Sequence, residues 1–87
     1  MPRVFIPALL KSLTGGREII DLPGDNVRQL IDELERQFPG IREKLCTETG
    51  MKPGLNVAVD GNISSRGLRQ KVASHSEVHF LPAIGGG

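Results

Sequence analysis

The run DNVRQLIDELERQF, residues 25–38, predicts one amphipathic helix. Asp25 can cap its start, and Pro39-Gly40 stops it in the usual way. The apolar residues recur at helical spacing and therefore share one face: Val27, Leu30, Ile31, Leu34 and Phe38. Because such a helix depends on its apolar face being covered, the strand signals on either side of it become its natural packing partners.

A first strand is predicted over Arg3–Leu10, which is rich in residues that favour extended chain. Period-two alternation puts Val4 and Ile6 on one face and Phe5 on the other. Pro7 lacks an amide hydrogen, so pairing there is limited to an edge or a bulge.

Thr14-Gly15-Gly16 predicts the turn that follows, because glycine readily adopts the positive φ of a tight hairpin. Arg17–Leu22 would then return antiparallel to the first strand. The glycine pair does not predict a phosphate loop, because the GxxxxGK[ST] pattern and the helix after it are both missing. The chain therefore opens with a β-hairpin.

The chain after the helix alternates short elements and turns. Ile41–Leu45 predicts a short second helical turn, and Thr47–Gly54 an exposed loop. Leu55–Val59 predicts a third strand, and Asp60-Gly61 favours a type I′ turn into a short fourth strand. Arg66–Lys71 is polar and basic with one apolar anchor; it suits either a solvated loop or contact with an acidic partner.

The last strand is predicted over Ser76–Leu81. If Val78 and Phe80 point into the core, alternation places His79 and Leu81 on the other face. Leu81 is then an exposed apolar residue immediately before the C-terminal segment. We interpret it as a candidate docking contact.

The composition describes one small domain. With 87 residues, 38% hydrophobic and 24% charged, the chain has room for a single, mainly aliphatic core. Three phenylalanines are its only aromatic residues, and eleven basic and ten acidic residues give a net charge of +1. Because the chain lacks stacking platforms and a basic stripe, we expect no nucleic-acid partner.

The single cysteine and the lack of long apolar runs suggest the compartment. No run approaches the roughly 20 residues of a membrane span, so we expect no membrane partner and a cytoplasmic location. Cys46 cannot form an internal disulfide, which fits a reducing compartment. It has no CxxC partner and no metal-ligand cluster around it. We expect a plain, partly buried thiol rather than a persulfide carrier, and no metal site.

The order of hairpin, helix, strand, short strand and last strand predicts an α+β fold of the β-grasp (ubiquitin-like) type. Its mixed sheet would have four to five strands, with one main helix packed on one face. The helix supplies the crossover that lets the first and last strands lie parallel and adjacent. We expect a β-grasp domain over residues 1–81 and a flexible Gly-rich tail over residues 82–87. That tail would project from one edge and reach on the order of 20 Å.

The terminal run Phe80-Leu81-Pro82-Ala83-Ile84-Gly85-Gly86-Gly87 has two interpretations. Because glycine has no Cβ, a terminal Gly run can enter a slot too narrow for side chains, where a partner could act on the last carboxylate. The alternative is an inert frayed end.

The whole chain resembles the MoaD/ThiS family of ubiquitin-like sulfur carrier proteins. The end of the chain is similar to that family's aromatic, apolar, Pro-x-Val-x-Gly-Gly terminus, which makes Gly87 the counterpart of its modified residue. Gly85 stands where the family often has Ala or Thr. Ile6-Pro7-Ala8-Leu9-Leu10 followed by Thr14-Gly15-Gly16 looks most like the CysO-type carriers of cysteine biosynthesis.

This resemblance implies that the chain is a substrate of other enzymes and not an enzyme. An E1-like adenylyltransferase would consume ATP and magnesium to adenylate Gly87, and a sulfur donor would convert it to a thiocarboxylate. Gly85 and Gly86 would insert into the partner, while Leu81 and Ile63 would dock. The sulfur acceptor would be a cysteine synthase-like enzyme or the large subunit of molybdopterin synthase. No bound cofactor is expected.

Three alternatives stay open. The chain could be a ubiquitin-like modifier conjugated through Gly87, the small subunit of molybdopterin synthase, or a β-grasp adaptor with an inert tail. Cysteine, molybdopterin and thiamine routes all use such carriers, and the choice among them depends on partner surfaces.

Overall fold

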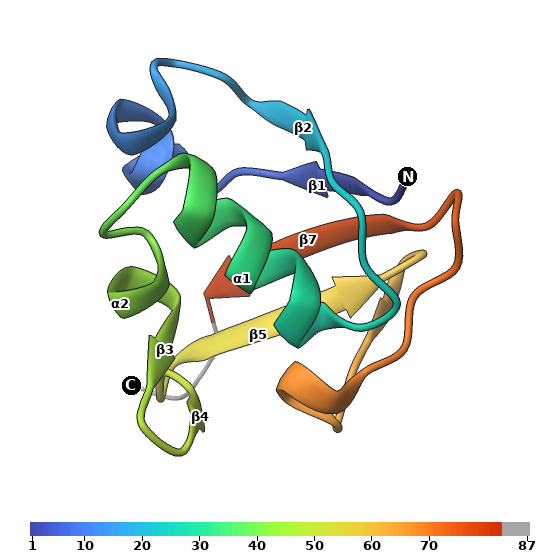
Figure 1. The fold of residues 1–87 in the computed structure, drawn as a ribbon. Helices are drawn as coiled ribbons and strands as arrows, with labels where there is room; N and C mark the ends of the chain where they lie inside the picture. Colours follow the sequence, from blue (N-terminus) through green and yellow to red (C-terminus); the bar gives the residue numbers. More distant parts are fainter. Residues whose placement is uncertain (83–87) are drawn as a thin grey trace.

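Five strands form one mixed sheet in the order β2-β1-β7-β5-β6 (Figure 1). The computed structural model describes residues 1–82, so the expectations for Gly85, Gly86 and Gly87 lie outside the described residues. The strands are β1 (Arg3–Phe5), β2 (Ile19–Asp21), β5 (Leu55–Val59), β6 (Asn62–Ile63) and β7 (Glu77–Pro82). The predicted α+β, β-grasp architecture is confirmed.

The first and last strands lie side by side and parallel, as predicted. Val4 pairs with Val78 and Phe5 with His79, while β2 pairs antiparallel with β1. On its other side β7 pairs antiparallel with β5. The last strand is thus the central strand of the sheet and not an edge strand, because the two hairpins β1–β2 and β5–β6 flank it. It includes Pro82, which pairs with Leu55 and which we had assigned to the tail.

The main helix, α1 (Val27–Gln37), lies across one face of the sheet (Figure 1). Four of its predicted apolar residues are buried, Val27, Leu30, Ile31 and Leu34, whereas Phe38 is the C-cap residue and is only partly buried. Val78 and Phe80 of β7 meet this face with 0% and 4% exposure. The face of the sheet under α1 is called the inner face below. The core comprises Val4, Ile6, Ile20, Leu22, Val27, Leu30, Ile31, Leu34, Ile41, Leu45, Val57, Val59, Val78 and Phe80.

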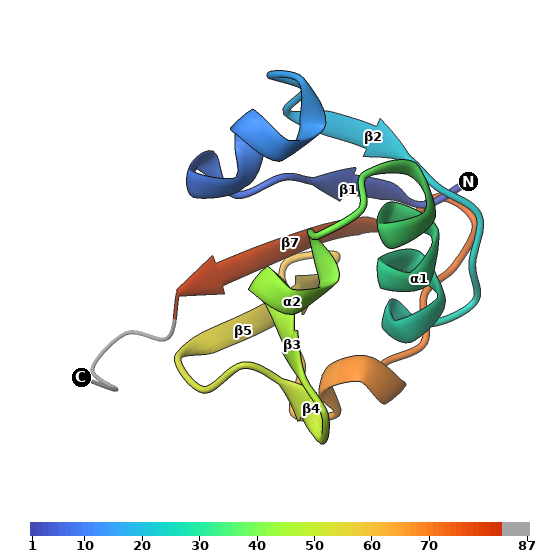
Figure 2. The same cartoon turned by 60° about the vertical axis from the view of Figure 1, so that its left-hand side comes forward.

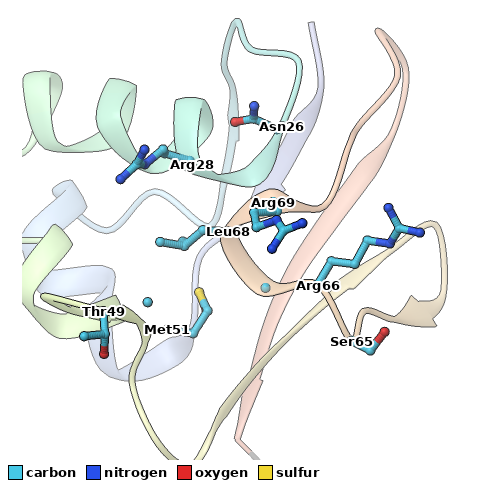
Figure 3. A pocket seen from close by; sticks show the side chains of 10 residues that line it. Asn26, Arg28, Thr49, Met51, Ser65, Arg66, Leu68 and Arg69 are labelled. Carbon is cyan, nitrogen blue, oxygen red and sulfur yellow. The ribbon is translucent and has the colours of Figure 1, made fainter.

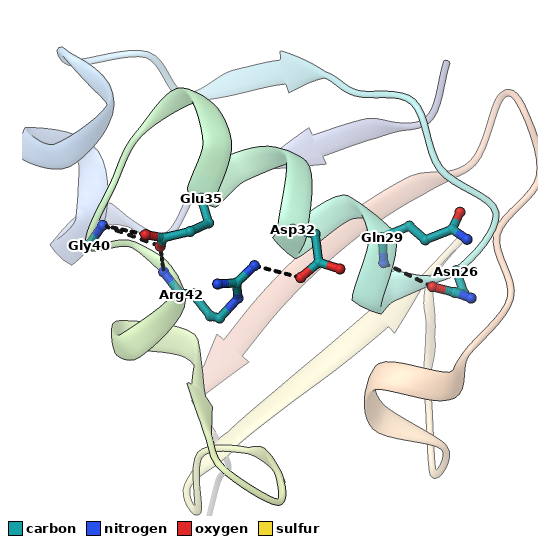
Figure 4. Close-up of polar contacts among 6 residues, drawn as sticks. All are labelled: Asn26, Gln29, Asp32, Glu35, Gly40 and Arg42. Carbon is teal, nitrogen blue, oxygen red and sulfur yellow. Dashed lines mark hydrogen bonds and ion pairs between the residues drawn. The ribbon is translucent and has the colours of Figure 1, made fainter.

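The helix is capped by Asn26 and not by Asp25, so the predicted cap is wrong by one residue. The Asn26 side chain accepts a hydrogen bond from the backbone amide of Gln29 at 2.9 Å (Figure 4). Gln29 in turn accepts one from the amide of Asp25 at 2.7 Å. Asn26 takes the role because its extended backbone precedes Gln29 by three residues, the spacing that a cap requires.

A single carboxylate organises the chain after α1. Glu35 accepts hydrogen bonds from the amides of Gly40 at 3.0 Å and Arg42 at 2.8 Å (Figure 4). The pKa of Glu35 is lowered because the Arg42 and Gly40 amides stabilise its charged form. Arg42 begins the predicted second helix, α2 (Arg42–Leu45), and forms an ion pair with Asp32 at 2.6 Å.

The first predicted strand is wrong beyond Phe5. Residues Ala8–Thr14 form a 3-10 helix, η1, because Pro7 ends the ladder and Leu10 donates to the Pro7 carbonyl at 2.9 Å. The hydroxyl of Thr14 is buried within hydrogen-bonding distance of the Lys11 and Arg17 carbonyls. The hairpin therefore has a helical connection rather than a tight turn.

The expected exposed loop at Thr47–Gly54 is only partly a loop. Cys46–Thr47 (β3) and Gly50–Met51 (β4) form a small antiparallel ribbon, in which Cys46 pairs with Met51. Met51 packs against the edge of the core. The sequence did not predict this ribbon, because the residues around it are polar and it contains only one long apolar side chain.

The turn Asp60-Gly61 has positive φ at both residues, 51° and 84°, as the predicted type I′ turn requires. The Asp60 carboxylate accepts from the Glu77 amide at 2.9 Å and the Ser76 hydroxyl at 3.0 Å. These donors lower the pKa of Asp60 and connect the turn to the start of β7.

None of the helices over residues 1–82 has both the length and the apolar character needed to cross a membrane.

Candidate functional site

The face of the sheet away from α1 carries an apolar row that crosses all five strands. Directly paired residues share a face, and Phe5 pairs with Ile19 and His79. Ala58 of β5 pairs with His79 and with Ile63. We call this set, Ile19, Phe5, His79, Ala58 and Ile63, the outer row.

Phe5 and His79 form the centre of the outer row. Their rings stack with centroids 4.0 Å apart and an angle of 11° between planes. The two rings lie face to face above β1 and β7, and we call this stacked pair the Phe5–His79 platform. The sequence placed both residues on this face, but it did not show that parallel pairing puts them in contact.

Leu81 lies on the same face as the outer row, two residues beyond His79. It pairs with Asn56 and is 38% exposed, as expected for a docking residue. Ile63 is 64% exposed on the edge strand β6. The two do not form one contact pair, because two strand spacings separate them, about 10 Å across the sheet. They are the two corners of one apolar surface.

The outer face is apolar at the end where β7 finishes and charged at the other end. Arg3 pairs with Asp21 on β2 and with Glu77 on β7, and its guanidinium lies 3.3 Å from the Asp21 carboxylate. This charged row precedes the outer row along β1 and β7. A partner that covers the apolar end therefore also approaches Pro82, where β7 ends.

A second apolar feature lies at the same end of the sheet. Because β1 and β7 run parallel, η1 follows β1 at the end where β7 stops (Figure 2). Leu9 and Leu13 of η1 are 93% and 36% exposed. The sequence analysis named neither residue as a candidate, because Leu9 lay in the predicted strand Arg3–Leu10 and Leu13 lay between that strand and the predicted turn.

Cys46 has the environment of an ordinary thiol. It is partly buried, and this burial raises its pKa above the usual value, which disfavours the reactive thiolate. Over residues 1–82, no cluster of three or more His, Cys, Asp or Glu residues could hold a metal ion. The feature that the described residues do offer is the exposed apolar part of the outer face.

Comparisons with known proteins agree with this geometry. The family model described as "ThiS family" matches residues 4–87. The protein named "Sulfur carrier protein CysO" of Mycobacterium tuberculosis strain H37Rv is 34% identical, with 97% of this chain and 96% of that protein covered.

Two solved structures are also similar over their full lengths. A chain in the Amycolatopsis orientalis BexX/CysO complex has a TM-score of 0.90 and 31% identity, with 100% of both chains covered. The crystal structure of Mycobacterium tuberculosis CysO has a TM-score of 0.87 and 29% identity, with 97% of this chain and 100% of that chain covered. The predicted resemblance is confirmed, and the chain belongs to the ThiS family.

Proposed function

We propose that this chain is a sulfur carrier and that Gly87 holds the sulfur as a C-terminal thiocarboxylate. One observation carries the proposal: the apolar end of the outer face leads directly, through Leu81 and Pro82, into the sequence Ala83-Ile84-Gly85-Gly86-Gly87. The name "Sulfur carrier protein CysO" of a relative at 34% identity supports it.

The loading chemistry requires a partner enzyme because a free carboxylate is a poor acyl donor. An E1-like adenylyltransferase would join the Gly87 carboxylate to the α-phosphorus of ATP and release pyrophosphate, with magnesium neutralising the phosphate charges. Sulfide would then attack the acyl carbon, forming the C–S bond as AMP leaves. With a persulfide donor, a thiol must also reduce the S–S bond. The carrier supplies neither acid nor base, so it acts as a substrate and not as an enzyme.

The folded domain would supply recognition. Leu81, Ile63 and the Phe5–His79 platform present an apolar surface to the partner, while Gly85 and Gly86 let the end of the chain pass a narrow entrance. From Pro82 to Gly87, an extended chain spans on the order of 20 Å. Docking and loading would therefore occur at separate places in one complex.

The route that we propose is cysteine biosynthesis, which the CysO-like sequence and the relatives named CysO support. The location that we propose is the cytoplasm. The acceptor would be a cysteine synthase-like enzyme; the large subunit of molybdopterin synthase is the alternative. A relative with 31% identity occurs in a complex with BexX, which supports the expectation that such carriers act through protein partners.

Intact-mass spectrometry tests the proposal. The protein, with its native C-terminus, is incubated with ATP, magnesium, sulfide and its cognate activating enzyme. We expect a mass gain equal to the difference between sulfur and oxygen. Conjugates of higher mass would instead indicate a modifier, and an unchanged mass with a verified partner would indicate an adaptor with an inert tail.

The matched control is a chain that lacks only Gly87. Because the core and the last strand are made by residues that precede Gly87 in the sequence, the shortened chain should fold with an unchanged urea midpoint. It should gain no sulfur. Loading of the shortened chain at the full-length rate would disprove the role of Gly87.

A further inference from the structure

A groove opens beside the start of α1, away from the outer row (Figure 3). Its volume is about 560 Å³. One wall is the start of α1, the second is the β3–β4 ribbon, and the third is the segment that contains the 3-10 helix η2 (Gly67–Arg69). We call it the arginine groove, after Arg28, Arg66 and Arg69, which line it.

Backbone hydrogen bonds fix the walls of the arginine groove. The Val27 amide donates to the Gln70 carbonyl at 2.9 Å, and the Val72 amide donates to the Asp25 carbonyl at 3.0 Å, so the η2 segment is held against α1. The Lys52 amide donates to the Leu45 carbonyl at 3.0 Å, which holds the ribbon to α2. The groove is therefore a feature of the folded backbone.

The floor of the arginine groove is apolar. Met51 from the ribbon and Leu68 from η2 pack against the core from opposite sides (Figure 3). Gly67 begins η2 with a φ of +55°, a left-handed conformation that favours glycine, and a Cβ there would make an ordinary van der Waals contact with the Met51 Cγ at 3.5 Å.

The rim has an uncompensated positive charge. Arg28, Arg66 and Arg69 are exposed, and no acidic residue lines the groove. In Figure 3 the guanidinium groups of Arg28 and Arg66 lie on opposite sides, with that of Arg69 between them. Within residues 1–82 none of the three forms an ion pair, although four other basic residues do: Arg3, Lys11, Arg36 and Arg42.

We propose that the arginine groove binds an acidic segment of a partner protein. An apolar side chain of that segment lies between Met51 and Leu68, and its carboxylates bind Arg28, Arg66 and Arg69 through charge-assisted hydrogen bonds. A segment several residues long fits this separation of charges better than one small anion. Nucleic acid fits poorly because no aromatic side chain lines the groove for base stacking.

The position of the groove gives this contact a distinct role. Its walls are α1 and the segments beside it, whereas the outer row lies on the opposite face of the sheet. A partner held in the groove leaves the Phe5–His79 platform and Leu81 uncovered. The proposal does not depend on the loading of Gly87, so either can fail without the other.

The test uses the full-length, ¹⁵N-labelled protein and a capped synthetic peptide with one leucine flanked on each side by two glutamates. We expect saturable shifts of the amide signals of residues 49–51 and 65–69. Binding should weaken strongly at about 1 M NaCl, where the Debye length is about 3 Å. A matched peptide with glutamines in place of the glutamates should bind at least tenfold more weakly.

Two variants and one matched control complete the experiment. Arg69→Glu and Arg66→Glu should each weaken peptide binding about tenfold, as expected when an ion pair is replaced by a like-charge contact. Arg17→Glu makes the same charge change at an exposed position on the η1–β2 connection, and should leave binding unchanged. Unperturbed amide signals elsewhere verify that each variant is folded.

Three results would overturn the proposal. One is an equal effect of Arg17→Glu, which would mean non-specific attraction. Another is equally tight binding of the glutamine peptide. The third is that inorganic phosphate moves the same signals at lower concentration than the peptide, which would indicate a small-anion site.

Discussion

Two neighbouring rows of paired residues in the sheet have side chains on opposite faces. Ile20, Val4, Val78 and Val59 lie on the inner face beneath α1, and none is more than 9% exposed. The outer row begins one residue away on each strand and contains Ile63, which is 64% exposed. Because side chains alternate strictly, β2, β1, β7 and β5 contribute to the core with one set of residues and to the outer row with the other. Adjacent mutations in β7 should therefore have unlike effects.

The largest effect is expected at Phe80 on the inner face. Phe80→Ala removes a buried ring and should lower the free energy of unfolding by about 3 to 5 kcal/mol. Urea denaturation followed by circular dichroism measures the loss. Leu81→Ala, at the next residue on the opposite face, is the control and should cost less than about 0.5 kcal/mol. Equal losses would show that the two faces do not divide these roles.

Substitutions on the outer face should weaken partner binding and leave the stability of the fold unchanged. Leu81→Asp places a charge on the apolar end of the docking surface, and should weaken the complex with the activating enzyme about tenfold, which is about 1.4 kcal/mol. Isothermal titration calorimetry measures this change, and the urea midpoint should stay near that of the wild type. Gln37→Asp adds the same charge at an exposed position on α1 and is the control. Unaltered affinity of Leu81→Asp would remove Leu81 from the interface.

The helix that covers the inner face depends on its cap. Asn26→Ala removes the acceptor for the Gln29 amide and should lower the free energy of unfolding by about 1 kcal/mol. Asp25→Ala should cost clearly less, because its side chain does not cap the helix. Paired urea titrations compare the two variants. If Asp25→Ala is the more damaging, the assignment of the cap to Asn26 is wrong.

The smallest effect concerns Asp60, at the turn that joins β5 to β6. Donation from the Glu77 amide and the Ser76 hydroxyl lowers its folded-state pKa below the ordinary value of 3.8. Its contribution to stability is therefore complete above pH 3.8 and is lost as the pH falls through the lower, folded-state pKa. Asp60→Asn should be slightly less stable at pH 7, with a difference that shrinks below pH 3.8.

Urea midpoints measured between pH 2 and pH 7 would show this dependence. Asparagine tolerates the positive φ of 51° at this position, so the backbone should not confound the comparison. Glu48→Gln removes a carboxylate that accepts no hydrogen bond from residues 1–82, and is the matched control. A pH-independent difference between Asp60→Asn and the wild type would contradict the assigned cause.

The sequence predicted an element correctly wherever a helical or strand periodicity continued without interruption. The spacing of Leu30, Ile31 and Leu34 predicted α1, and the alternation around Val78 predicted which face of β7 is buried. The β-grasp fold followed, because a helix between two hairpins allows parallel pairing of the first and last strands. The same alternation placed Leu81 on the exposed face, whereas Ile63 was named only through the family resemblance.

The remaining features depend on neighbours that are distant in the sequence. Whether Phe5 contacts His79 is decided by the register of β1 on β7, and no local pattern reports that register. The arginine groove forms only where α1, the ribbon and η2 meet. The sequence alone therefore could not predict that Arg28 lines the same groove as Arg66 and Arg69. Pro7 indicated that strand pairing is interrupted at this position. The 3-10 helix after it was not predicted, because it leaves Leu9 exposed and has no apolar periodicity.

The central position of β7 has a mechanical consequence. A protein that grips residues beyond Pro82 and pulls along the strand would load the ladders to β1 and β5 together. The antiparallel ladder lies perpendicular to that pull, so its hydrogen bonds would resist in shear. An edge strand such as β6, pulled across its ladder, would instead peel away one bond at a time. The domain should therefore resist unfolding when force is applied to its last residues. A partner can pull the end of the chain toward itself while the folded domain stays intact.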